Sequence, residues 1–423
     1  MESTSASGRR PVNAARLTTE QVAQYLGVKP ATVYAYASRG LLTSQRSEGR
    51  TSTFDPAEVE RLVTRARGSR GARAEAPVVA SALTFIDGER HWYRGRDALR
   101  LAADGCTLEE VAGWLWESDL APAAPWTCPE AMSAAGLAAQ RALPASALPL
   151  DRLRVATTAA GVTDSLRYDT SPAAVVAAAR HLVVCLVESL PLVIDPPPTA
   201  VAASSAGVGP GAGLAERLWP RLTGLEPTAE RLRLLQVALV VMADHELPVS
   251  TLATRLAAST GAHIYAVVSA GLGAIDGPLH GAASLAAEAL VAEIAGGKDA
   301  ARAVGERLRR GERIPGFGQP LYPDGDPRAR LLLEMLRPVA GERAMRPVDD
   351  LVAVMAERGL PAANVDLAIA AVAHQMQMIG GAAEAVFTIA RVVGWVAHAR
   401  EEYASPTHYR PRAVYVGPPP DQP

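Results

Sequence analysis

The sequence predicts an all-α protein, and three observations support this expectation. Alanine and leucine dominate long stretches, whereas aromatic residues make up only 5% of the 423 residues. This balance favours close-packed helices over strands, which prefer β-branched and aromatic side chains. From residue 80 onward, apolar residues recur at helical spacing between Pro and Gly interruptions, and few segments alternate apolar with polar residues. The length allows two or three folding units.

The first predicted elements are two short helices near the N-terminus. Thr18 can cap a helix in which Gln21, three residues on, completes a capping box, and Gly27 ends that helix. Pro30 is suited to the first turn of a second helix, and Val33 has the spacing needed to pack back on the first helix. The pair is therefore interpreted as a helix-turn-helix.

A small wing and a third helix are expected to complete this N-terminal module. Residues 43–54 are rich in Ser, Thr, Gly and Arg, the composition of a wing, and Asp55 with the following proline can begin a third helix. Residues 1–15 are small and polar and are expected to be disordered. We predict a winged helix-turn-helix over residues 1–67, followed by a linker over residues 68–78.

The stretch LTTEQVAQYLGVKPATVYAYASRGLL resembles the MerR or excisionase type of winged helix-turn-helix. Residues 1–70 hold 11 Lys and Arg against 6 Asp and Glu, although the whole chain has a net charge of −2. The resemblance implies that the second helix enters the DNA major groove and that arginines of the wing contact phosphates. The implied DNA-binding residues are Thr32, Tyr34, Ser38, Arg39, Arg46 and Arg50. The alternative is a helical appendage that binds protein or nothing.

Several classes of protein are not expected. The three cysteines are far apart in the sequence and form no CxxC pair, so neither a zinc site nor a disulfide framework is predicted, and a reducing cytoplasm fits. The apolar segments near 234–243 and 365–399 are interrupted by charged residues, His or Gln before they reach membrane length. We therefore expect a cytoplasmic protein without a membrane span.

Five segments place polar residues beside Gly or Pro inside apolar runs, where an unpaired polar group would be costly. They are FIDGERHWYRGRDALRLA (85–102), ADHELPVSTLATRLAAS (243–259), GAIDGPLHG (273–281), IPGFGQPLYPDGDPRA (314–329) and NVD (364–366), followed by Arg391 and the tail YRPRAVYVGP. Taken singly, each has a simpler explanation. His245 suits a core histidine, His280 a turn cap, Asp366 a helix N-cap and Arg328 a surface ion pair.

In this order and spacing, the segments resemble the citrate synthase family over residues 80–418. The resemblance implies a helical enzyme that condenses an acyl-CoA with oxaloacetate. Such a reaction needs a carboxylate base to remove a methyl proton and a hydrogen-bond donor for the enolate oxygen. By resemblance, Asp366 is the base and His280 the donor, and the position of Gln319 is also catalytic.

The resemblance also implies how the two substrates are held. Oxaloacetate carries two carboxylates, which planar guanidinium groups match bidentately. The matching residues are His245, Arg328, Arg391 and Arg410. In the family, the arginine at the position of Arg410 reaches into the partner subunit's site, which implies a homodimer. The backbone of Pro315, Gly316, Phe317 and Gly318 is implied for CoA, because glycines allow close approach. No metal and no cofactor other than the CoA co-substrate is implied.

The sequence departs from the family at three positions. The family usually has histidine where Gln319 stands, and this histidine polarises the ketone and supplies its proton. Glutamine donates a hydrogen bond but no proton, and the loss of a general acid costs about 10²–10⁴ in rate. Pro248 stands where Asn is common, and Pro323 occupies a position that is often basic and near the CoA phosphates.

These observations leave three functional hypotheses open. The first is a citrate or 2-methylcitrate synthase. The second is a catalytically weakened metabolite sensor or DNA-binding regulator with the synthase fold, and the third is a paralogue that only pairs with an active synthase. In each case the resemblance implies a large domain from residues 79–282 and 378–423 and a small, mobile domain from residues 283–377.

Overall fold

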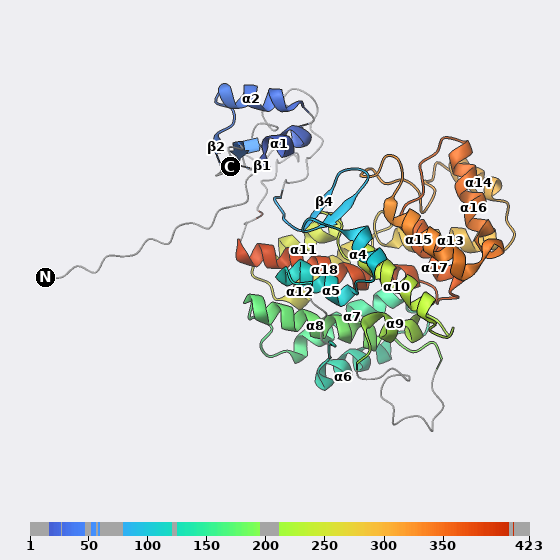
Figure 1. The fold of residues 1–423 in the computed structure, drawn as a ribbon. Helices are drawn as coiled ribbons and strands as arrows, with labels where there is room; N and C mark the ends of the chain where they lie inside the picture. Colours follow the sequence, from blue (N-terminus) through green and yellow to red (C-terminus); the bar gives the residue numbers. More distant parts are fainter. Residues whose placement is uncertain are drawn as a thin grey trace, which may run out of the picture. The chain divides into compact units, whose positions relative to one another are not determined.

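The computed structural model describes residues 17–26, 28–46, 52–55, 58–59, 79–120, 125–194, 211–405 and 409. The chain divides into two compact units, Met1–Ala82 and Leu83–Pro423 (Figure 1). The linker predicted over residues 68–78 lies outside the described residues.

The N-terminal unit contains the predicted helix-turn-helix and wing. It comprises β1 (Leu17–Thr18), α1 (Thr19–Leu26), α2 (Pro30–Ser38), β2 (Ser44–Arg46) and β3 (Ser52–Phe54). The strands form an antiparallel sheet in the order β1-β3-β2. Its core is formed by the buried side chains of Val22, Ala23, Val33, Leu42, Phe54 and Val59.

Hydrogen bonds at the starts of the helices in this unit match the sequence prediction. The backbone N–H of Thr18 donates to Gln21 Oε1 at 2.7 Å, and the N–H of Gln21 donates to Thr18 Oγ1 at 3.3 Å. The predicted capping box is therefore confirmed. The N–H groups of Glu58 and Val59 donate to the carbonyl of Asp55, as in a helical first turn, and most of the predicted third helix lies outside the described residues.

The second unit is mostly helical, as predicted. Its helices are α4 (Ala98–Asp104), α5 (Leu108–Glu117), α6 (Glu130–Ala139), the 3₁₀ turn η1 (Gln140–Ala142), α7 (Pro149–Thr163), α8 (Pro172–Ser189), α9 (Leu214–Leu222), α10 (Ala229–Val241), α11 (Val249–Ser259), α12 (Ile264–Ile275), α13 (Ala282–Ala295), α14 (Ala300–Arg309), α15 (Pro327–Ala340), α16 (Glu342–Glu357), α17 (Val365–Gln375) and α18 (Ala382–Ala404). The longest of these, α18, is buried along nearly its whole length and packs against α5, α8, α10, α11 and α12.

A small sheet, which the sequence did not predict, precedes these helices. Strands β4 (Thr84–Ile86), β5 (His91–Tyr93) and β6 (Arg96–Asp97) pair antiparallel in the order β4-β5-β6. Runs of two or three residues are too short to show the alternation that identifies a strand. The sheet matters because it carries His91 and Tyr93 into the core, where both are fully buried.

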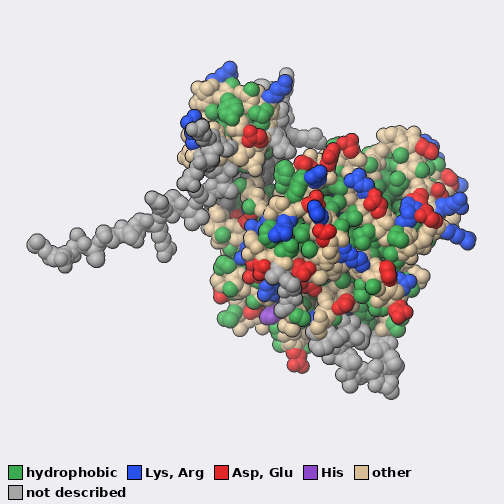
Figure 2. Space-filling model, viewed as in Figure 1, with side chains coloured by type: hydrophobic (Ala, Val, Ile, Leu, Met, Phe, Trp, Pro, Cys, Tyr) green, Lys and Arg blue, Asp and Glu red, His purple; other side chains and the backbone are tan. Residues whose placement is uncertain are grey.

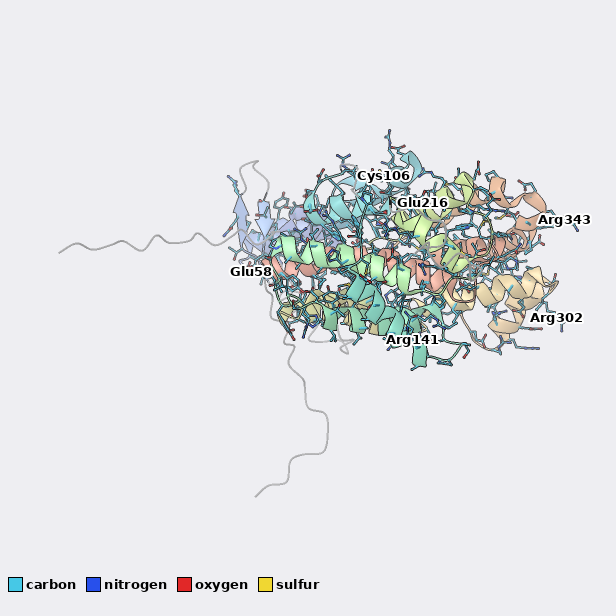
Figure 3. The ribbon with its side chains drawn as sticks, turned by 90° about the horizontal axis from the view of Figure 1, so that it is seen from below. Glu58, Cys106, Arg141, Glu216, Arg302 and Arg343 are labelled. Atoms are coloured by element: carbon cyan, nitrogen blue, oxygen red, sulfur yellow. The ribbon has the colours of Figure 1, made fainter. Side chains whose placement is uncertain are left out.

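Helices α13 to α17 gather at one end of the second unit (Figure 1). In the view from below, Arg302 on α14 and Arg343 on α16 lie at this end, whereas Arg141 of η1 lies away from it (Figure 3). Helices α13 and α17 pack closely against each other, and α15 packs on α17. The described residues of 83–423 form one compact unit, and their division into a large and a small domain stays a prediction.

Two helices are long and apolar enough, by composition alone, to cross a membrane. They are α8 and α18, in which 56% and 100% of the apolar window is buried inside the structure, as in the core helices of a folded domain. On the face shown in Figure 2, basic and acidic side chains are interspersed over residues 83–423. The expectation that no segment spans a membrane stays a prediction.

Candidate active site

Asp366 lies in the first turn of α17 and is held there by two polar contacts. Its backbone N–H donates to the side chain of Asn364, which is the N-cap of the helix, at 3.0 Å. The hydroxyl of Ser284, on α13, donates to Asp366 Oδ1 at 2.6 Å. The N-cap role considered for Asp366 is therefore filled by Asn364. Among the described residues, no group pairs with Asp366 Oδ2, which leaves one carboxylate oxygen available to a ligand.

The environment of Asp366 favours its protonated form. Burial raises the pKa of the carboxyl above its usual value, although the hydrogen bond from Ser284 and the charge of Arg328 act in the opposite direction. A carboxylate with a raised pKa is a stronger base than an ordinary surface aspartate. Asp366 is half-buried. It is therefore accessible to a ligand and also partly desolvated.

His280 lies just before α13, four residues from Ser284, and is therefore close to the start of α17. Its Nε2 is 2.7 Å from the hydroxyl of Ser250, and the Nε1–H of Trp395 donates to that same hydroxyl at 3.3 Å. Burial, followed by the charge of Arg391, lowers the pKa of His280 to about 4. The imidazole is thus neutral at pH 7. If the Ser250 hydroxyl donates to Nε2, then Nδ1 carries the hydrogen and can donate it to a ligand.

Arg328 lies in the first turn of α15 with only 2% of its surface exposed, so the surface ion pair considered for it is wrong. Its Nε and Nη2 donate to the two oxygens of Asp326 at 3.0 and 2.7 Å. Although burial acts to lower it, the charge of Asp326 raises the pKa of Arg328 above its usual value. Asp326 Oδ2 also accepts from the backbone N–H of Val365 at 3.1 Å, which ties the start of α15 to the start of α17.

Arg391, in the middle of α18, is 1% exposed. Its Nε donates to the carbonyl of Met242 at 3.1 Å, and no described carboxylate forms an ion pair with its guanidinium. Burial lowers its pKa to about 10, so the group remains cationic at neutral pH. A buried cation without an anionic partner is costly, and a carboxylate ligand would compensate it. The Cζ atom of Arg391 is 4.7 Å from the ring centre of Phe387, which is itself 6.1 Å from the ring centre of His280, so Arg391 and His280 border the same aromatic ring.

His245 follows α10 on a backbone turn in which Glu246 has a positive φ of 56°. Its Nε2 is 3.1 Å from the hydroxyl of Tyr322. Burial lowers the pKa of His245 well below its usual value, with further lowering by the charge of Arg328, so the ring is neutral. The structure therefore brings His245, from the second sequence segment, against Tyr322, from the fourth.

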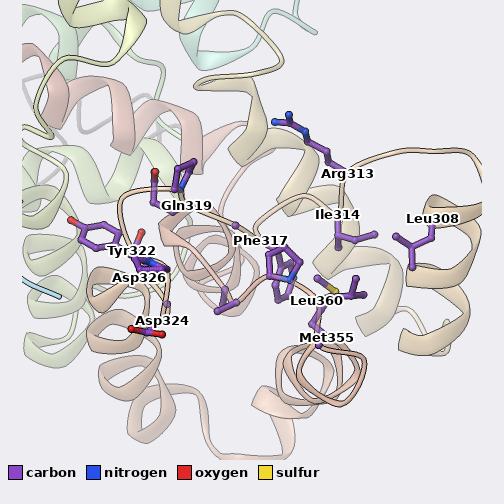
Figure 4. A pocket seen from close by; sticks show the side chains of 18 of the residues that line it. Leu308, Arg313, Ile314, Phe317, Gln319, Tyr322, Asp324, Asp326, Met355 and Leu360 are labelled. Carbon is purple, nitrogen blue, oxygen red and sulfur yellow. The ribbon is translucent and has the colours of Figure 1, made fainter. Parts of the chain in front are cut away.

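A cavity of about 800 Å³ lies beside this site, between the end of α14, the loop 312–326 and the segment 355–363. Phe317, Ile314 and Leu360 form part of its apolar wall, and Gln319 and Tyr322 lie on its other side (Figure 4). Gln319 is half-buried, and its Oε1 accepts from the N–H of Leu321 at 3.3 Å. Of the four residues implied for CoA, Phe317 and Gly318 line this cavity, whereas Pro315 and Gly316 are not among its lining residues.

Gly316 is needed where the chain passes α17. Its φ is +82°, and a Cβ atom built on it would lie 2.8 Å from the Cβ of Leu367, the residue after Asp366. Its carbonyl accepts from the N–H of Asn364 at 2.9 Å. Only glycine allows this approach and this conformation together, so the segment implied for CoA is fixed to the helix that carries Asp366.

Several residues of the site could not be predicted from the sequence. Ser250, Ser284 and Tyr322 each contact a predicted residue, and only the fold brings the two together. His91, on β5, packs edge-on against His245 with ring centroids 5.4 Å apart. It is fully buried, and both of its ring nitrogens lack a described partner. Burial, then the charge of Arg328, lowers its pKa to about 3.

The remaining predicted residues belong to the N-terminal unit or lie outside the described residues. Arg410 and Arg50 lie outside the described residues. In the N-terminal unit, α2 presents exposed Tyr34 and Ser38, with Arg39 directly after the helix, whereas Thr32 is half-buried. Arg46, in β2 of the wing, is exposed, and basic side chains lie at the edge of this unit (Figure 2).

Comparisons with known proteins agree with this fold. The model of the citrate synthase C-terminal domain family matches residues 72–412. The helical fold is thus the citrate synthase fold. Its described helices are similar to a solved structure of citrate synthase from Thermoplasma acidophilum in a ternary complex with carboxymethyl coenzyme A and oxaloacetate, with a TM-score of 0.63 and 24% identity over 82% of this chain and 95% of that one.

The chain belongs to the citrate synthase family, and a helix-turn-helix domain model matches its residues 16–67. Citrate synthase 2 of Bacillus subtilis is 35% identical over 214 residues, which are 49% of this chain and 56% of that protein. The 2-methylcitrate synthase of Shewanella oneidensis is 33% identical over 200 residues, which are 46% of this chain and 53% of that protein. The chain thus spans about half the length of these curated relatives.

Proposed function

We propose that the chain is an acyl-CoA condensing enzyme that joins acetyl-CoA or propionyl-CoA to oxaloacetate, giving citrate or 2-methylcitrate and free CoA. The observation that carries this proposal is the arrangement of Asp366 and His280. Asp366 is held by Ser284 at the start of α17, and His280 lies four residues before Ser284. Arg391, which forms no ion pair with a described carboxylate, lies over the ring of Phe387, and His280 packs edge-on against the same ring. A base, a neutral donor and a carboxylate receptor are the groups that this chemistry needs.

The first step is enolisation of the thioester. Asp366 Oδ2 removes a proton from the carbon next to the thioester carbonyl, and the electron pair of that C–H bond moves onto the carbonyl oxygen. The Nδ1–H of His280 donates a hydrogen bond to this developing oxyanion. Because its pKa is about 4, His280 acts as a neutral donor, a role for which a lowered histidine pKa is suited.

The second step forms the carbon–carbon bond. The carbon of the enolate attacks the ketone of oxaloacetate. The carboxylates of oxaloacetate are held by Arg391 and by those N–H groups of Arg328 that do not bond Asp326. The ketone oxygen gains a proton, which Gln319 cannot supply, so water must deliver it and the reaction is slow. Water then cleaves the thioester of the product, the CoA thiol leaves, and Asp366 releases the proton that it took up. This chemistry requires no metal or prosthetic group.

We further propose that the active form is a homodimer. Large apolar side chains stand exposed near the C-terminal end of α7 and in the turn that follows it: Val162 is 73% exposed, Leu166 76% and Tyr168 69%. Contiguous patches of exposed apolar side chains mark association surfaces. Size-exclusion chromatography with light scattering measures the mass directly, and a monomer would contradict this part of the proposal.

The test of the condensation is thiol release with product analysis. Wild-type protein mixed with acetyl-CoA and oxaloacetate is expected to release free CoA and to form citrate detectable by mass spectrometry. With propionyl-CoA, the expected product is 2-methylcitrate, and the ratio of the two rates gives the preference. Omission of oxaloacetate is the control. No thiol release above that control with either thioester would overturn the proposal.

A second candidate function is favoured by the N-terminal unit together with Gln319. A catalytically weakened synthase body would sense metabolites and alter DNA binding through α2, with Tyr34, Ser38 and Arg39 facing the groove. Retention of promoter fragments, altered by oxaloacetate or CoA and lost in Arg39→Ala, would support it. Unchanged mobility with every ligand would contradict it.

A further inference from the structure

A buried chain of polar groups lies behind the site and starts at Asp244, the residue before His245. Asp244 is fully buried. Its Oδ2 accepts from the hydroxyl of Thr84 on β4 and lies 3.3 Å from Nε2 of His398 on α18. Burial acts to raise the pKa of Asp244, but His398 and Arg391 outweigh it, so the pKa is lower than usual. Asp244 is thus a buried carboxylate that His398 helps to keep ionised.

The partners of His398 allow only one tautomer. Nη1 of Arg255 lies 2.8 Å from His398 Nδ1, and a guanidinium can only donate. Nδ1 must therefore accept, which leaves the hydrogen of the neutral ring on Nε2, where it is donated to Asp244. Arg255 is itself held, because its Nε donates to Glu402 Oε1 at 2.6 Å.

One face of α18 holds this chain against the segment that carries His245. Arg391, Gly394, His398 and Glu402 recur every three or four residues and so share that face. Gly394 donates its N–H to the carbonyl of Ala243 at 3.0 Å, and Arg391 donates to the carbonyl of Met242. Gly394 lies one turn after Arg391, and His398 lies two turns after it. Through these two residues, α18 contacts the backbone of Ala243 and the side chain of Asp244, just before His245.

We propose that His398 and Asp244 are positioning residues for the α-keto dicarboxylate: they fix the 242–245 segment on α18 so that His245 and Arg391 face one ligand. This inference rests on the proposed function. Neither residue needs to touch the ligand. A displacement of about 1 Å in a binding group can cost up to about 10²-fold, so the loss appears in the affinity for oxaloacetate and leaves that for acyl-CoA unaffected.

The test compares two substitutions of His398. His398→Gln can still accept from Arg255 and donate to Asp244, whereas His398→Leu keeps the volume and removes both bonds. We expect His398→Leu to raise the KM for oxaloacetate about 10- to 100-fold, with the KM for acyl-CoA unchanged, and His398→Gln to restore most of the loss. Equal changes in both KM values, or no rescue by Gln, would overturn the proposal.

The matched control is Gln140→Leu. Gln140 is buried, and its Nε2 donates to the carbonyls of Gly136 and Ser189, on helices outside the site. This substitution also removes two buried hydrogen bonds and is expected to lower the melting temperature without changing the KM for oxaloacetate. If His398→Leu does not fold, Thr84→Val removes only one hydroxyl from Asp244 and is expected to raise the same KM by a smaller factor. An unchanged KM in that variant would equally overturn the proposal.

A second readout does not depend on catalysis. In ¹⁵N-histidine-labelled protein, His398 is expected to show an unprotonated Nδ1 and a protonated Nε2 at neutral pH. The opposite tautomer, or an imidazolium, would overturn the positioning chain alone. An intact tautomer in a protein that releases no CoA thiol would instead overturn the proposed function alone.

Discussion

Ser284 donates its hydroxyl to Asp366 Oδ1 at 2.6 Å and so joins the first turn of α13 to the first turn of α17. This contact fixes one oxygen of the carboxylate and leaves the other to the substrate. It also stabilises the ionised form and opposes the effect of burial, which raises the pKa of Asp366.

Ser284→Ala is expected to move the acid limb of the kcat/KM profile to higher pH. The base must be ionised, so activity falls as the pH drops through the pKa of Asp366. Removing a donor that lowers this pKa raises it further. His280, with a pKa of about 4, stays neutral above that value. Ser269→Ala, which removes only a bond to Tyr265 of the same helix, is the control and should leave the profile in place. A limb at unchanged or lower pH would contradict the assignment.

Gln319→His is expected to raise kcat for thiol release. An imidazole at this position of the cavity wall could donate a proton to the ketone oxygen, and general acid catalysis contributes about 10²–10⁴-fold. Gln319→Leu, which donates nothing, should be slower than wild type. Equal kcat values in the histidine variant and the wild type would show that proton supply at residue 319 does not limit the rate.

Gly394→Ala is expected to destabilise the protein although alanine favours helices by about 1 kcal/mol. A Cβ atom on Gly394 would lie 2.4 Å from Asp244 Oδ1 and 2.5 Å from the carbonyl oxygen of Ala243. Overpacking of this kind costs about 1–3 kcal/mol, which a lower urea midpoint would report. The control is Gly305→Ala in α14, where nothing lies within 4 Å of the new methyl group. A midpoint as high as that of the control would contradict the close approach of α18.

The sequence predicted the helical fold and the residues with distinctive chemistry, but not their supporting partners. Asp366, His280, Arg328 and Arg391 stand in motifs whose order is specific, so they could be proposed for the site without coordinates. Ser250, Ser284 and Tyr322 are ordinary residues whose roles depend on contacts between distant segments.

The contacts of two histidines and the strands β4 to β6 likewise could not be predicted from the sequence. Strands β4 to β6 are too short for an alternating pattern to identify them. His398 stands outside the motifs, and only the fold shows that it lies beside Asp244. His91 lies inside a motif, yet only the packing of β5 shows that it meets His245.

The central claim is that Asp366 is the base of an acyl-CoA condensation. Asp366→Asn keeps the size of the side chain and the acceptor for Ser284 but cannot take a proton. The most direct measurement is kcat for thiol release in this variant together with its dissociation constant for oxaloacetate. We expect kcat to fall about 10²–10⁴-fold while oxaloacetate binds as in the wild type. An unchanged kcat would contradict the account.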